Sequence, residues 1–134
     1  MRDKRLDQFI SQLEAYLERM ALFNRFIDRA RSKDFTPEDE QRFLELKSNL
    51  VQETEAILAK IDSGAPARED VSGLIALAPS LRTISLSQET NIRHIESQWH
   101  KLYLAWQAVL GQLKVRQGEV QNQSFLGSIF GRKK

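Results

Sequence analysis

Apolar residues recur at every third or fourth position along the first 30 residues of the chain. They fall at Leu6, Phe9, Leu13, Tyr16, Met20, Phe23, Ile27 and Ala30. A spacing that alternates between three and four over several heptads is typical of the seam of a coiled coil. Ile10 and Leu17 widen this stripe, which favours packing against two neighbouring helices instead of one. We therefore expect a long helix that ends near residue 33 and lies within a bundle.

The run Thr36-Pro37-Glu38-Asp39 predicts the start of a second helix. A hydroxyl residue at the N-cap, proline at the first helical position and acids in the first turn all stabilise a helix N-terminus. Helical spacing continues through Phe43, Leu46, Leu50, Ile57 and Ile61, with Leu44, Val51 and Leu58 beside them. The run from Asp62 to Pro66 then ends the pattern, because glycine and proline interrupt helices. Since only a few residues separate the two helices, we expect an antiparallel hairpin.

The helical pattern is weaker between residues 71 and 88. Leucine and isoleucine keep the spacing at Leu74, Leu77, Leu81 and Ile84. Gly73 and Pro79 interrupt it, and the run from Ser85 to Gln88 offers a further helix start. We therefore expect a kink or break between residues 78 and 88.

From residue 92 the seam returns at full strength. Its members are Ile92, Ile95, Trp99, Leu102, Trp106, Val109, Leu113 and Val120, and only Arg116 departs from the pattern. A continuous helix over residues 79–122 would be about 65 Å long, whereas the first helix would span roughly 40–45 Å. Either residues 71–84 fold back as a short fourth helix, which we favour, or the last helix overhangs the hairpin and exposes an apolar end.

The predicted fold is therefore all-α. It is an elongated, coiled-coil-like three-helix bundle that consists of the antiparallel hairpin and one long, kinked third helix. The short fourth helix is the variant in which residues 71–84 fold back. We place the bundle domain at residues 1–123 and treat residues 124–134 as a flexible C-terminal tail.

The C-terminal tail is the segment whose apolar residues are least explained by packing in the core. It contains four apolar residues and three cations: Phe125, Leu126, Ile129, Phe130, Arg132, Lys133 and Lys134. The segment is too short to form a stable helix in isolation. These seven residues are the predicted binding site, because they suit a groove on another protein or an anionic membrane surface. The alternative is that the tail folds back on the bundle.

Composition narrows the class of protein further. The 134 residues suffice for one domain with its own core. The absence of cysteine excludes disulfides and thiol catalysis, and it fits a reducing compartment. The N-terminus lacks the apolar stretch of a secretory signal, and no apolar run approaches the roughly 20 residues that span a bilayer. We expect a soluble, cytoplasmic protein.

Charge is unevenly distributed along the chain. Cations exceed anions in residues 1–33 and 63–134, whereas anions exceed cations in residues 34–62. This distribution favours an arrangement in which the acidic helix neutralises the basic helices packed antiparallel to it. The alternative is that the acidic helix presents a face that binds a partner. One basic group comprises Arg25, Arg29, Arg31 and Lys33. Helix-end electrostatics accounts for this group, and the net charge of +2 is too small for a dedicated nucleic-acid binder.

Residues with catalytic or ligand-binding chemistry do not form a recognisable pattern. Trp99 and Trp106 are one heptad apart, so we expect them in the core, with a ligand-stacking platform as the weaker alternative. His94 and His100 are six positions apart and cannot chelate one metal from the same helix. Glu96 and His100 are suitably spaced for a surface ion pair. We expect no catalytic residue, no metal and no cofactor.

These observations predict a non-enzymatic helical module that binds another protein, as an adaptor, an export-type chaperone or an assembly subunit. Apolar helix surface and the tail would supply the contacts, and a homo-oligomer is one form of such binding. The alternative is a peripheral membrane protein that docks through the tail. The outline of a helical hairpin, a long helix and a tail in a small cysteine-free chain resembles flagellar and type III export chaperones. This resemblance carries over no motif and no residue, and the partner, the pathway and the oligomeric state stay open.

Overall fold

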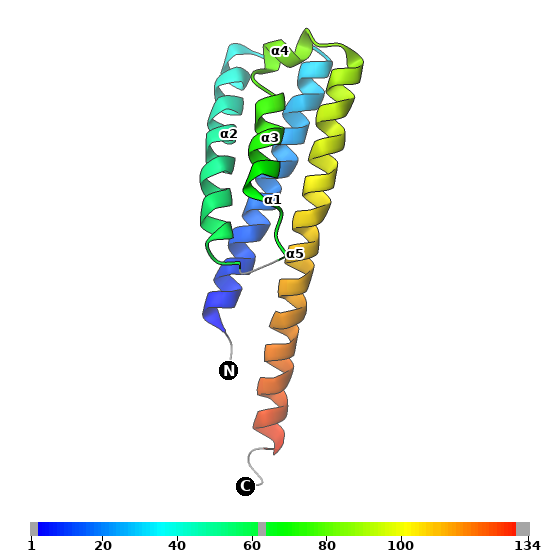
Figure 1. Ribbon diagram of the computed structural model, residues 1–134. Coiled ribbons are helices and arrows are strands. Elements are labelled where there is room, and N and C mark those ends of the chain that lie inside the picture. The colour runs from blue at the N-terminus through cyan, green and yellow to red at the C-terminus, as the bar shows by residue number, and fades with distance from the viewer. Residues whose placement is uncertain (1–2, 62–63, 131–134) are drawn as a thin grey trace.

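The computed structural model describes residues 3–61 and 64–130, with side chains up to residue 120. Within these ranges the chain contains helices, turns and no strand, which confirms the predicted all-α class. Five helices follow one another along the described chain (Figure 1). They are α1 (Lys4–Arg31), α2 (Pro37–Leu58), α3 (Arg68–Leu77), α4 (Leu81–Ser85) and α5 (Glu89–Phe130).

Side-chain caps define the ends of the hairpin formed by α1 and α2. The carboxylate of Asp3 accepts hydrogen bonds from the first free N–H groups of α1, at 3.0 and 3.1 Å. Lys33 takes a left-handed conformation with φ 58°, and this turns the chain towards α2. Thr36 and Asp39 form a capping box in which each side chain accepts from the other residue's N–H, at 3.1 and 2.9 Å. The predicted start of the second helix is confirmed.

The structure does not confirm the three-helix arrangement, because α3, α4 and α5 replace the long third helix. Pro79 lies between α3 and α4, where its missing N–H and its ring are incompatible with a continuous helix. The carboxylate of Glu40 on α2 accepts hydrogen bonds from the N–H groups of Leu81 (3.0 Å) and Arg82 (2.8 Å). A side chain distant in sequence thus caps α4. Residues 71–84 do fold back, but as parts of two helices, α3 and α4, where one short helix was expected.

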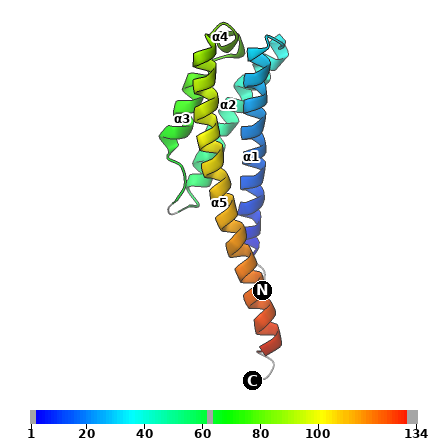
Figure 2. The same cartoon turned by 90° about the vertical axis from the view of Figure 1, so that its right-hand side faces the viewer.

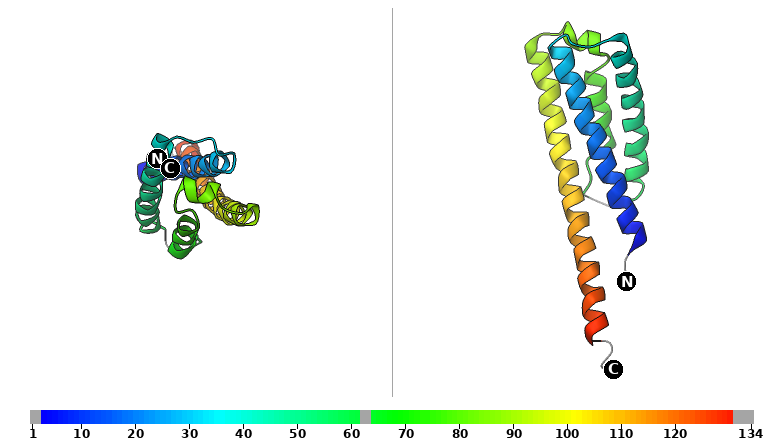
Figure 3. Two further views of the ribbon diagram at one scale, coloured as in Figure 1. Left: turned by 90° about the horizontal axis from the view of Figure 1, so that it is seen from above. Right: turned by 180° about the vertical axis from the view of Figure 1, so that it is seen from behind.

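Helices α1, α2, α3 and α5 run side by side with alternating directions, and α4 lies across one end (Figures 1 and 3). Contacts join α1 to α2 and α5, and α3 to α2 and α5, so the four helices surround one core. Helix α4 packs on α1 and α2 and covers that core at its upper end in Figure 1. The opposite end has no such cover in the described chain.

The core is continuous from one end of the hairpin to the other. Every residue of the predicted first seam is buried. The largest fully buried side chains include Trp106, Tyr16, Phe23 and Phe43. The Tyr16 ring packs edge-on against Trp106 with ring centroids 5.2 Å apart, which ties α1 to α5. Burying a large apolar side chain contributes roughly 1.5–3 kcal/mol to stability, so these seams account for the helix packing.

Candidate functional site

Helix α5 extends well beyond the helix against which it packs. The amide of Gln117 donates a 2.7 Å hydrogen bond to the carboxylate of Asp7, in the first turns of α1. No later residue up to Val120, where the side-chain description ends, bonds to α1. The backbone of α5 nevertheless continues to Phe130, about 20 Å further at 1.5 Å per residue. Figures 1 and 2 show this overhang projecting below the N-terminus of α1.

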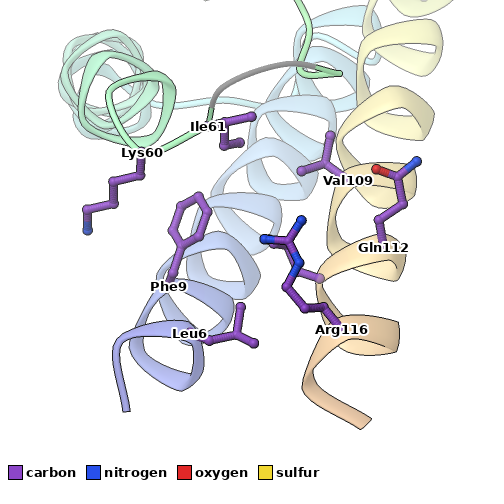
Figure 4. A pocket seen from close by; sticks show the side chains of 8 residues that line it. Leu6, Phe9, Lys60, Ile61, Val109, Gln112 and Arg116 are labelled. Carbon is purple, nitrogen blue, oxygen red and sulfur yellow. The ribbon is translucent and has the colours of Figure 1, made fainter. Parts of the chain in front are cut away.

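A hollow with both apolar and polar walls lies where the overhang leaves the packed helices. It has a volume of about 240 Å³. Its apolar walls come from α1, from the segment that follows α2 and from α5, and consist of Leu6, Phe9, Ile61, Val109 and Leu113. All but Ile61 are buried members of the core. The hollow (Figure 4) is therefore the uncovered end of that core, opposite the end that α4 covers (Figure 1).

Cations surround this hollow. The guanidinium of Arg116 reaches into it from α5, between Phe9 and Val109 (Figure 4). Among the side chains that the structure describes, none forms a hydrogen bond or an ion pair with Arg116. Lys60 lies over the other side of Phe9, with its ammonium 5.6 Å from the ring centroid and 2.7 Å from the amide oxygen of Gln12.

A second hollow of about 380 Å³ overlaps the first and extends it along the start of α1. It shares Leu6, Phe9, Lys60 and Arg116 with the first hollow and adds Arg5, Gln8 and Asp3. The carboxylate of Asp3 is engaged as the N-cap of α1. An apolar floor with three cations at its rim suits a ligand or partner that is apolar and anionic.

The predicted tail residues fall mainly outside the described part. Phe125, Leu126, Ile129 and Phe130 belong to the backbone of α5, but their side chains are outside the described residues. Arg132, Lys133 and Lys134 lie outside the described residues altogether. The structure extends α5 past the predicted boundary at residue 123. The assignment of residues 124–134 as a binding tail stays a prediction.

The sequence contained one signal for the hollow. Arg116 is the only residue that departs from the apolar seam of the last helix, and it is the cation that enters the hollow. Sequence reasoning missed Leu6, Phe9 and Ile61 as site residues, because their spacing is the same as that of residues in the covered core.

The tryptophan pair divides between the core and its edge. Trp106 is fully buried, whereas Trp99 is half-buried and stacks on Tyr103 with ring centroids 4.7 Å apart. The indole N–H of Trp99 donates to the carbonyl oxygen of Met20 at 2.7 Å. Trp99 therefore links α5 to α1, and its hydrogen-bonding group is already engaged.

Glu96 pairs with Arg31, whereas the sequence suggested His100 as its neighbour. One N–H of Arg31 donates to Glu96 at 3.0 Å, a second N–H donates to the other carboxylate oxygen, and Glu89 lies 3.1 Å away. This bidentate contact raises the pKa of Arg31 above its ordinary value. His94 and His100 are exposed. The Arg31 side chain therefore joins the end of α1 to the start of α5.

Two members of the basic group at the end of α1 form ion pairs. Arg29 pairs with Asp39 at 3.1 Å, and Arg31 pairs with Glu96. This agrees with a structural role for these two cations.

In residues 3–61 and 64–130 no cluster of three or more His, Cys, Asp or Glu is placed to hold a metal ion. No described helix is long and apolar enough to cross a membrane.

In comparisons with known proteins, no family model, no curated protein and no solved structure matches this chain. The class that the fold defines is an all-helical protein with one uncovered end. Functional inference rests on the geometry of that end.

Proposed function

We propose that this chain is a non-enzymatic, cytoplasmic helical module that binds another protein at its uncovered end. It would serve as an adaptor, an export-type chaperone or an assembly subunit. The single observation that carries this proposal is the overhang of α5 beside the hollow at the end of the core. Between them they form a notch with an apolar floor and a free helix along one side.

A partner helix fits this notch by continuing the line of α1 along α5. Recognition of an amphipathic helix in an apolar groove is a common mode of protein binding. Apolar residues of the partner would cover Leu6, Phe9 and Ile61, which are the uncovered end of the core. The negative end of the helix dipole and any terminal carboxylates would then lie near Arg5, Lys60 and Arg116. The predicted tail would add contacts further along α5.

Site-specific photocrosslinking in cells tests this proposal. We place benzoylphenylalanine at Gln112, an exposed residue that lines the hollow, and at Gln52 on α2 as the matched control. We expect one adduct of fixed mass from position 112 that contains a protein other than this chain, and none from position 52. Arg116→Glu should abolish the adduct because it reverses the charge inside the hollow, whereas Arg82→Glu, an exposed residue at the other end, should leave it unchanged.

Two results would contradict the proposal. One is an adduct at position 112 that is no stronger than at position 52. The other is an adduct that survives Arg116→Glu at full intensity. Removal of residues 124–134 separately tests the tail, and we expect it to weaken the adduct.

The alternative function is peripheral docking on an anionic membrane through the tail. It is favoured by the cations Arg5, Lys60 and Arg116, which lie at the end of the molecule from which α5 projects. One short apolar segment with a few cations gives only modest membrane affinity. Sedimentation with vesicles of phosphatidylserine and phosphatidylcholine at low salt decides this alternative. Binding that is absent, or that persists after removal of residues 124–134, excludes it.

A further inference from the structure

The outward face of α5 carries a second heptad pattern, which we call the outer seam. Its described members are Leu104, Ala108, Gly111, Val115 and Gly118. They are spaced alternately four and three apart, and they lie on the side of the helix opposite Trp106 and Leu113, which face the core. Leu104 is 50% exposed and Val115 is 63% exposed. Leu104, Ala108, Gly111 and Val115 are exposed and Gly118 is half-buried, so most of the outer seam is an apolar stripe that nothing in the described chain covers.

The same spacing continues by number into the overhang, through Asn122, Phe125 and Ile129. None of the eight positions from 104 to 129 holds a charged residue. By contrast, the exposed positions of α1 include Glu14, Glu18 and Arg25. An exposed helix face is normally polar or charged. An uncharged seam of heptad period is the pattern of a helix that pairs with another helix.

Two glycines support the same conclusion independently. Gly111 and Gly118 lie within α5, where glycine lowers helix stability relative to alanine. Neither has a positive φ, and a Cβ added at either position would meet nothing from the rest of the described chain within 4 Å. The fold of a single chain therefore does not require them. Their effect is to let a second helix approach the backbone of α5 closely, at positions one heptad apart.

We propose that the outer seam binds a second copy of this chain, so that the two α5 helices form a parallel two-stranded coiled coil. The inference deepens the proposed function, because it rests on α5 as a binding helix and names the partner on this face. Helices α1 and α3 pack on other sides of α5. The two copies can therefore lie on opposite sides of the helix pair.

Charges beside the seam favour this pairing. In a parallel coiled coil, the residue that precedes an a position lies near the residue five places later on the partner helix. Lys114 and Glu119 stand in this relation, whereas Gln107 and Gln112, one heptad earlier, are neutral. The Nζ of Lys114 lies 3.4 Å from Glu14 in an exposed pair, which leaves its ammonium open to a further carboxylate. Antiparallel pairing over the same span would not bring this cation and anion together.

The asparagine at position 122 favours the same arrangement. It occupies an a position of the outer seam by number. A single asparagine at an a position is a known determinant of two strands in fixed register. Small residues at Ala108 and Gly111 and larger residues at both ends of the seam are compatible with close approach along the middle of α5.

Cysteine crosslinking of the full chain tests the register, since the chain has no cysteine of its own. Leu104→Cys and Val115→Cys are each expected to form intermolecular disulfides under mild oxidation. Val51→Cys, on the exposed side of α2, is the matched control. Parallel pairing requires both outer-seam variants to crosslink faster than the control. Failure of both, or crosslinking at only one of them, overturns the proposal.

Molecular mass in solution supplies the second measurement. We expect sedimentation equilibrium to give a dimer, and Val115→Glu to raise its dissociation constant about tenfold or more, since like charges would meet in the seam. Val51→Glu should leave the constant unchanged, and circular dichroism should show that both variants stay folded, because both side chains are exposed. A monomer at all concentrations, or a dimer that Val115→Glu does not weaken, overturns the proposal.

The two proposals fail separately. If the chain is a monomer but position 112 still crosslinks to another protein, only the coiled-coil inference falls. If a dimer forms and position 112, which also flanks the outer seam, crosslinks only to a second copy of this chain or to nothing, the uncovered end is not the binding site and the proposed function falls.

Discussion

The hydroxyl oxygen of Tyr16 lies 2.8 Å from that of Thr54, inside the core between α1 and α2. Thr54 donates its hydrogen to the carbonyl oxygen of Leu50 at 2.6 Å, so Tyr16 is the donor in the contact with Thr54. Both side chains are buried. The apolar pattern of α2 skips from Leu50 to Ile57, and Thr54 fills this gap with a polar group that has its partners.

A double-mutant cycle should detect this contact. Tyr16→Phe is expected to lower the free energy of unfolding by about 1 kcal/mol, because one buried hydrogen bond is lost. Thr54→Val should cost more, about 1–3 kcal/mol, because the phenol of Tyr16 is left buried without an acceptor. The double variant should be less destabilised than the sum of the two. Urea unfolding measures all four proteins, and strictly additive effects would contradict the contact.

The pH dependence of stability should report the burial of Tyr16. Burial raises the pKa of its phenol from 10.0 to about 12. Because the folded state holds the proton more tightly, this contribution is complete below pH 10 and is lost as pH rises from 10 to about 12. The loss approaches about 1.4 kcal/mol per pH unit over that window. Unfolding curves of the wild-type chain and Tyr16→Phe should converge in this range, and parallel pH profiles would refute the assignment.

Asp39 should make the stability of the protein fall at low pH, whereas Tyr16 makes it fall at high pH. The backbone N–H of Thr36 holds the pKa of Asp39 below its ordinary value of 3.8, with help from the Thr36 hydroxyl and the Arg29 guanidinium. A lowered pKa means that this contribution is present above about pH 4 and is lost as pH falls through the folded pKa. The stability difference between the wild-type chain and Asp39→Asn should therefore shrink below pH 4. A difference that is independent of pH would argue against the ionised cap.

Arg31 should depend on the shape of its guanidinium as well as on its charge. Arg31→Lys is expected to lose about 0.5–1 kcal/mol, because an ammonium cannot make the bidentate contact with Glu96. The loss should become smaller at about 1 M salt, where ion pairs are screened. Arg93→Lys, at an exposed pair with Glu89, is the control and should have almost no effect. Equal losses in thermal unfolding of both variants would contradict the proposed link between α1 and α5.

Fluorescence should distinguish the two tryptophans. Trp99→Phe leaves Trp106, which is fully buried, and Trp106→Phe leaves Trp99, which is half-buried. The protein with Trp106 alone should emit at shorter wavelength and be quenched less by acrylamide. Circular dichroism checks that both variants are folded. The reverse order of emission and quenching would mean that the rotation of α5 about its axis is wrong.

The sequence alone determined the local features of this protein. The alternation of three and four in the first seam predicts a helix, and all eight residues of that seam are buried. The run from Thr36 to Asp39 predicts a helix start, and the capping box lies there. These predictions succeed because caps and helical periodicity depend on residues within a turn or two of each other.

Only the tertiary structure decided which residues from different helices meet. Glu40 on α2 caps α4, and Glu96 pairs with Arg31 on α1 instead of with His100 on its own helix. The hollow combines Phe9 with Arg116, and the face of α5 that stays free is defined by where α1 and α3 pack. Periodicity states which face of a helix is apolar, but the register and rotation between helices follow from packing of the whole core.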